Sequence, residues 1–101
     1  AEVEWHDGYP VTNNDPAATD QFFAVARASL GQDRVRLVAN ASMGGEDFSY
    51  YGHHVSACFF ILGVKPPGRD SQPSLHQPEY DFNDDALETG IEVMARLVMA
   101  E

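Results

Sequence analysis

The chain has 101 residues, 44% hydrophobic and 22% charged, and its 16 acidic and 6 basic side chains give a formal charge of −10 at pH 7. This length allows one modest core, and the hydrophobic fraction is too high for a disordered tail. The charge argues against nucleic acid or an anionic membrane as a partner, and no apolar run reaches the roughly 18 residues of a membrane-spanning helix.

The cysteine content and the first residues bear on location. A single cysteine, Cys58, excludes an internal disulfide and fits a reducing compartment, so we expect a cytoplasmic protein. The opening AEVEWHDG has neither the basic nor the apolar region of a signal peptide. Because the chain starts abruptly in strand-like sequence without a methionine, we expect it to be a piece of something longer.

Three segments have the composition of strands. Residues 2–6 and 34–38 alternate polar and apolar side chains, which is the period of a half-buried strand. Residues 57–64, ACFFILGV, form the most apolar stretch and predict a strand buried on both faces.

Helices are predicted between these strands and at the end of the chain. Asp15 and Pro16 form a helix start, and Gly31 suits the C-terminal cap, so the first helix spans 16–30. Residues 46–54 fit a short helix with acids at its start. A final helix over about 84–100 has Asn83 as its N-cap. Its apolar stripe consists of Leu87, Ile91, Met94 and Val98.

The order of these elements predicts the fold class. Strands that alternate with helices indicate an α/β architecture, a layered and partly parallel sheet with flanking helices. The irregular segment 65–78 is the longest connection, and a connection of this length in a small domain is usually functional or mobile.

His76 is the most informative of the four histidines. It lies in the long loop, and α/β folds place their sites in loops at the ends of strands. Histidines without a role are common in loops, so that alternative stays open. The adjacent pair His53 and His54 is better explained as a polar helix end than as two metal ligands, because neighbouring residues point in different directions.

The segment MGGEDF, residues 43–48, is the second candidate. Gly44 and Gly45 would let the backbone approach a ligand closely or adopt a positive φ. The alternative is a simple turn in which Glu46 and Asp47 cap a helix. Cys58 lies in an apolar segment and is expected to be a structural thiol, since a reactive thiolate needs exposure and a nearby cation.

Four motifs together resemble a known family. They are GYPVTNNDPAAT, MGGEDFSYY, FFILGV and LHQPEYDFNDDALETG, in this order over essentially the whole chain. They are similar to the C-terminal part of the metal-dependent amidohydrolases of the aminoacylase and carboxypeptidase family. Members of this type include hippurate hydrolase, N-acyl-amino-acid amidohydrolases and indole-acetyl-amino-acid hydrolases. A departure is His54-Val55-Ser56-Ala57, which stands where a proline-glycine turn often precedes the apolar strand.

The resemblance implies a two-domain parent enzyme with two divalent metals, of zinc, manganese, cobalt or nickel, in its catalytic domain. Residues 1–7 would be the last strand of the lid, which often mediates dimerisation. Residues 8–14 would be the return crossing, and residues 15–101 the C-terminal half of the catalytic domain.

The same resemblance assigns roles to four residues. His76 would be the family's last metal ligand, and Gly44, Gly45 and Glu46 would lie beside the substrate pocket. The catalytic glutamate and the other metal ligands of the family match no residue here. One ligand cannot hold a catalytic metal, because such a site needs about three protein ligands and a water.

Two hypotheses follow. In the first, the chain is the C-terminal segment of an amidohydrolase that cleaves N-acyl amino acids, and it is inactive without the missing N-terminal portion. In the second, it is a free-standing, non-catalytic α/β module that forms a homo-oligomer through open sheet edges.

Overall fold

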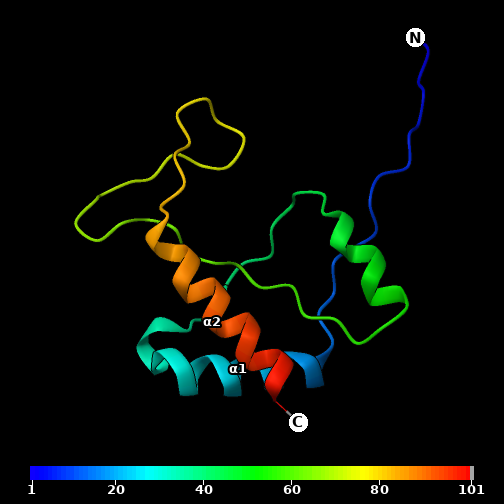
Figure 1. Cartoon of the computed structure of the whole chain (residues 1–101). Coiled ribbons are helices and arrows are strands. Elements are labelled where there is room, and N and C mark those ends of the chain that lie inside the picture. Colours follow the sequence, from blue (N-terminus) through cyan, green and yellow to red (C-terminus); the bar gives the residue numbers. More distant parts are fainter. Residues whose placement is uncertain (101) are drawn as a thin grey trace. The chain divides into compact units, whose positions relative to one another are not determined.

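The computed structural model describes residues 1–100, and its regular elements are all helical (Figure 1). They are α1 (Pro16–Leu30), the 3-10 helices η1 (Gln32–Arg34) and η2 (Asp47–His53), and α2 (Asp85–Met99). The chain forms two compact units, Ala1–Phe59 and Phe60 onward, and each is described here by itself. Within residues 1–100, no helix is long and apolar enough to cross a membrane.

The predicted α/β layered sheet is wrong. Residues 2–6, 34–38 and 57–64 contain no strand in the structure, and η1 takes the start of the second segment. A strand exists only when a neighbour supplies its backbone hydrogen bonds, and alternation in the sequence reports a preferred face without reporting a neighbour. Several apolar side chains of these segments are accordingly exposed, as Trp5 (85%) and Leu37 (77%) show, although Val35 and Ala57 are buried.

The prediction for α1 is confirmed to the residue. The Asp15 side chain accepts a hydrogen bond from the Ala18 N–H at 2.9 Å, and Pro16 opens the helix without an unpaired donor. Gly31 ends the helix with a φ of 88°, a backbone conformation that residues with a Cβ avoid. On the apolar side of α1, Ala26 is buried.

A side chain takes the place of a neighbouring strand beside residues 57–59. The Asn14 Oδ1 accepts the Phe59 N–H at 2.8 Å, and the Asn14 Nδ2 donates to the Phe59 carbonyl at 2.9 Å. The next residue, Asp15, donates its backbone N–H to the Ala57 carbonyl at 2.9 Å. These bonds tie the start of α1 to the apolar segment across more than 40 residues of sequence.

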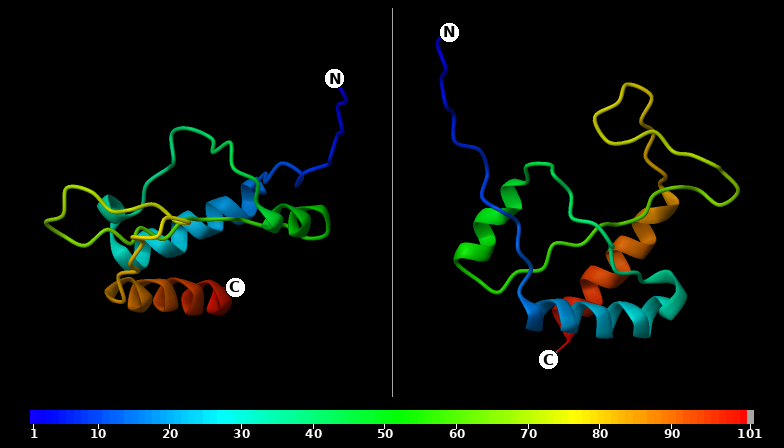
Figure 2. Two further views of the ribbon diagram at one scale, coloured as in Figure 1. Left: turned by 90° about the horizontal axis from the view of Figure 1, so that it is seen from above. Right: turned by 180° about the vertical axis from the view of Figure 1, so that it is seen from behind.

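The second unit contains the predicted irregular segment and the predicted final helix, α2, and both predictions are confirmed. The ribbon from residue 65 to residue 82 makes two wide turns before α2 begins (Figure 2). The Asn83 side chain accepts the Asp85 N–H at 3.3 Å and so supplies the cap, although the residue just before the helix is Asp84. Ala86 and Val93 are the buried residues of α2.

Candidate functional site

His76 lies in a turn of the long loop with an unusual backbone. It is the one residue other than glycine with a positive φ (67°) within residues 1–100. This left-handed conformation costs an L-residue about 1–2 kcal/mol, although histidine tolerates it better than most. The side chain of His76 is exposed, so its imidazole nitrogens are accessible.

Two glutamines hold the loop around His76. The Gln77 Oε1 accepts the Ser74 N–H at 3.1 Å, and the Gln77 carbonyl accepts the Tyr80 N–H at 3.0 Å. Further out, the Gln72 Nε2 donates to the Asp81 carbonyl at 2.6 Å and closes the base of the loop. The turn that carries His76 is therefore held by hydrogen bonds on both sides.

The segment of Gly44, Gly45 and Glu46 lies in the first unit. Glu46 is the N-cap of η2 and accepts the Phe48 N–H at 3.1 Å, as in the alternative that assigned the acids to a helix start. Neither glycine has a positive φ. Position 45 favours glycine because the Tyr9 ring lies close to the backbone there. A Cβ at this position would lie 3.1 Å from that ring.

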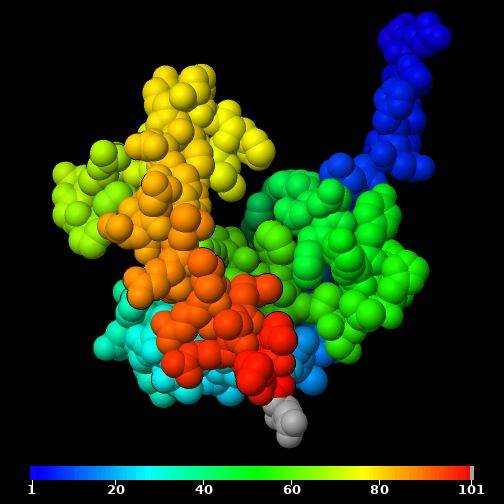
Figure 3. Space-filling model, viewed as in Figure 1, coloured from blue at the N-terminus to red at the C-terminus, as the bar shows by residue number. Residues whose placement is uncertain are grey.

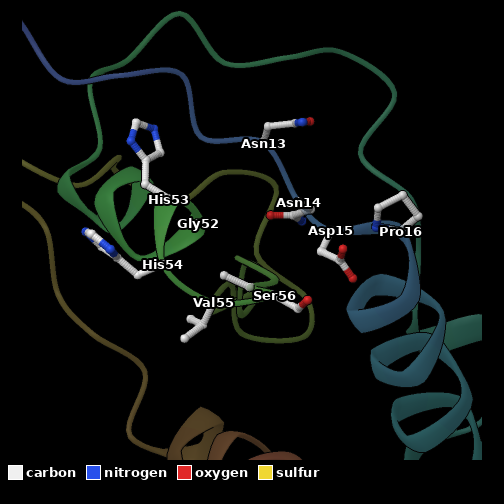
Figure 4. A pocket seen from close by; sticks show the side chains of 10 residues that line it. Asn13, Asn14, Asp15, Pro16, Gly52, His53, His54, Val55 and Ser56 are labelled. Carbon is white, nitrogen blue, oxygen red and sulfur yellow. The ribbon is translucent and has the colours of Figure 1, made fainter.

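A polar pocket of about 390 Å³ also lies in the first unit (Figure 4). The start of α1 and the end of η2 line it, with residues 13–16 on one side and residues 52–57 on the other. His53 and His54 leave the ribbon in different directions, as expected for adjacent residues (Figure 4). The two imidazoles therefore do not converge on a ligand in this pocket.

Asn14 and Asp15 organise this pocket, and the sequence reasoning assigned only Asp15 a role. The bonds of Asn14 to Phe59 join residues 45 apart in sequence, and no local pattern signals such a pair. Cys58 lies beside them, half-buried, with its Sγ 3.6 Å from the Asn14 Nδ2.

The described residues do not supply a complete site for a divalent metal. Within residues 1–100, no three histidine, cysteine, aspartate or glutamate side chains group closely enough to hold a metal ion. A catalytic metal needs about three protein ligands. The chain alone does not fit a complete metal site, and His76 could contribute one ligand at most.

Comparison with known proteins decides the family. The profile described as peptidase family M20/M25/M40 matches residues 1–100. The chain belongs to this M20 family. The resemblance drawn from the four motifs is thereby confirmed, and the membership supports the metal dependence that the resemblance implies.

Three relatives of this M20 chain carry the names of hydrolytic enzymes. YhaA of Bacillus subtilis, named as an amidohydrolase, is 35% identical over 94 residues, which cover 93% of this chain and 24% of YhaA. The N-acetyldiaminopimelate deacetylase of Listeria monocytogenes (serovar 1/2a) is 33% identical, over a match that covers 92% of this chain and 24% of the deacetylase. IAA-amino acid hydrolase ILR1-like 6 of Arabidopsis thaliana is 31% identical, over a match that covers 86% of this chain and 18% of the hydrolase.

The M20 chain spans about a quarter of the length of the curated relatives that it matches first. No solved structure matches it significantly. The expected boundaries after residues 7 and 14, the metal role of His76 and the pocket role of Gly44, Gly45 and Glu46 stay predictions.

Proposed function

We propose that this M20 chain is the C-terminal part of a metal-dependent amidohydrolase that cleaves the amide bond of N-acyl amino acids, hippurate-like compounds included. His76 would contribute one metal ligand, and Gly44, Gly45 and Glu46 would form part of the substrate pocket. The observation that carries the proposal is the backbone of His76, an exposed imidazole at a φ of 67° inside the LHQP motif of a chain that matches M20 over residues 1–100.

The conformation of His76 supports a chemical role. Residues kept in sparsely populated backbone regions tend to occur where function needs their side chains. Histidine is also the commonest metal ligand among side chains, and it binds through a neutral ring nitrogen. The hydrogen bonds of Gln77 and Gln72 keep the turn in place, so the ring is presented from a supported loop.

The names of two relatives support the substrate class. An N-acetyldiaminopimelate deacetylase removes an acetyl group from an amino acid, and an IAA-amino acid hydrolase separates an acyl group from an amino acid. The bond is in both cases an amide between a carboxylic acid and the nitrogen of an amino acid. We extend this bond class to the present chain, together with a cytoplasmic location.

The isolated chain should not catalyse this reaction. A single candidate ligand cannot retain a catalytic metal, and no metal-holding group is found within residues 1–100. Purified residues 1–101 should therefore give no turnover of N-acetyl or N-benzoyl amino acids with added zinc, manganese, cobalt or nickel. Robust metal-dependent turnover by the pure chain would refute this part of the proposal.

A chimera tests the role of His76. Residues 1–101 replace the matched quarter of the Listeria monocytogenes deacetylase, and hydrolysis of N-acetyldiaminopimelate and hippurate is measured together with bound metal. His76→Gly should lower kcat/KM at least about 100-fold and reduce the metal content, because a missing ligand costs more than the 10- to 100-fold loss of an outer-shell partner. Leu75→Gly, one residue away, is the matched control. Unchanged metal content in His76→Gly would exclude His76 as a ligand.

A further inference from the structure

Three rings of the first unit, those of Tyr9, Tyr50 and His53, form an aromatic patch. The Tyr9 and Tyr50 rings meet edge to face, with centroids 6.1 Å apart and planes at 84°, and the Tyr50 and His53 centroids are 6.4 Å apart. Tyr9 is 57% exposed and Tyr50 50%, and His53 is exposed as well. Figure 3 shows η2, which carries Tyr50 and His53, in green at the surface. The rings therefore hold one another in place while a large part of each residue stays open to a ligand.

Tyr9 joins the aromatic patch to the segment that holds Gly44, Gly45 and Glu46. A Cβ at position 45 would lie 3.1 Å from the Tyr9 Cδ2, so the ring packs directly against the Gly45 backbone. Glu46 follows at once and caps η2, the helix that carries Tyr50. The residues proposed for the substrate pocket and the aromatic patch are therefore neighbours within the first unit.

The charges around the aromatic patch select the end of a substrate that it can accept. An N-acyl amino acid has a carboxylate at one end and an uncharged acyl group at the other. Glu46 and Asp47 follow Gly45 directly, and residues 1–26 and 37–64, which include the whole patch, contain no lysine or arginine. These segments would repel a carboxylate and offer it no cation. The acyl end, which has no charge, avoids this cost.

The side chains of the patch favour an acyl group that is itself a ring. Aromatic pairs gain stability beyond the area that they bury, when they stack with an offset or meet edge to face. A benzoyl group can use both arrangements, whereas an acetyl group places a single methyl against the rings. The exposed apolar side chains Ile91 (68%) and Val98 (82%) of α2 are aliphatic and offer no such pairing.

We infer that the aromatic patch binds an aromatic acyl group, such as benzoyl, and that Tyr9 is a specificity-determining residue that favours this group over acetyl. The inference rests on the proposed function, because Tyr9 borders the pocket that was assigned there to Gly44, Gly45 and Glu46. It names the acyl group, which the proposed function left open.

The chimera with the Listeria deacetylase tests this inference with two substrates that differ in the acyl group alone, hippurate (N-benzoylglycine) and N-acetylglycine. Tyr9→Ala should lower the ratio of kcat/KM for hippurate to kcat/KM for N-acetylglycine at least about tenfold, because it removes a ring that only the benzoyl group can pair with. Tyr9→Phe keeps the ring and should restore most of the ratio. Tyr51→Ala is the matched control: Tyr51 is 63% exposed on the same helix η2, but its ring packs on Phe48, with centroids 5.3 Å apart, and the ratio should not change.

A binding measurement gives a second readout that needs no turnover. The chimera is treated with EDTA, its methyl groups are irradiated, and saturation transfer to hippurate is recorded by NMR. The benzoyl protons should receive more saturation than the glycine methylene protons, and Tyr9→Ala should remove at least half of this difference. Circular dichroism checks that each variant keeps the helix content of the wild-type chimera.

The outcomes separate this inference from the proposed function. Equal losses of kcat/KM for both substrates in Tyr9→Ala would reduce Tyr9 to a structural role and overturn the inference, and so would a failure of hippurate to bind. Hydrolysis of both substrates at a ratio that Tyr9→Ala leaves unchanged would sustain the proposed function and reject the aromatic patch. A chimera that binds the benzoyl ring through Tyr9 but hydrolyses neither compound would sustain the patch and reject the proposed function.

Discussion

Replacement of His76 by glycine should stabilise the isolated chain. The φ of 67° lies in the left-handed region, where an L-residue has a penalty of about 1–2 kcal/mol that glycine lacks. Glycine loses about 0.5–1 kcal/mol through the greater freedom of its unfolded state. Since the imidazole is exposed, its removal costs little packing, and His76→Gly should raise the free energy of unfolding by up to about 1.5 kcal/mol.

A series of substitutions gives this expectation an order. Asn tolerates a positive φ, so His76→Asn should stay within about 0.5 kcal/mol of the wild type. His76→Val should lose about 1 kcal/mol or more, because a branched Cβ is a clear outlier in this region. The adjacent control Leu75→Gly has an ordinary φ and should lose about 0.5–1 kcal/mol.

Urea unfolding followed by circular dichroism measures these differences, with the slope against urea required to stay constant. A stability order in which glycine is highest and valine lowest supports the strained turn. A loss of more than about 1 kcal/mol in His76→Gly would refute the reasoning, because the imidazole would then make stabilising contacts that exceed the backbone strain.

Substitutions at Asp15, Asn14 and Gly45, with a control at Asp20, test the first unit. Asp15→Ala removes the bond to the Ala18 N–H and should cost about 1 kcal/mol by urea unfolding, whereas Asp20→Ala within α1 should be nearly neutral. Asn14→Ala should cost about 1 kcal/mol, and Asn14→Asp more, because a carboxylate oxygen would face the Phe59 carbonyl in place of a donor; a value for Asn14→Asp equal to the wild type would contradict the paired bonds. Gly45→Ala places a Cβ 3.1 Å from the half-exposed Tyr9 ring. The Tyr9 and Tyr50 rings have centroids 6.1 Å apart, and the substitution should weaken the nuclear Overhauser contacts between them. Unchanged contacts would show that Gly45 is not needed for this packing.

The helices could be predicted because their signals are local. Asp15, Pro16 and Gly31 mark the two ends of α1 from positions in or next to the helix, and Asn83 marks the start of α2 in the same way. The apolar stripe of α2 was also visible, since helical spacing shows which residues share a face. Spacing does not show what covers that face, and Ile91 is 68% exposed.

The sheet could not be predicted correctly because strands depend on partners. Residues 57–64 have the composition of a strand, but the groups that pair with Phe59 come from Asn14, 45 residues earlier, and from a side chain. The left-handed backbone of His76 also had no sequence signal, because the LHQP motif contains no glycine. The family was accessible from four motifs in order, whereas a metal site needs residues that the motifs of this chain do not supply.

The uncovered side chains of α2 have a consequence for handling the protein. Exposed apolar strips on separate molecules attract each other at short range, whereas a charge of −10 on each molecule repels at longer range. Salt shortens that repulsion from about 30 Å at 0.01 M to about 8 Å at 0.15 M ionic strength. The colloidal stability of the purified chain should therefore decrease as salt is added, so dilute buffers at neutral pH are the conditions of choice for storing it.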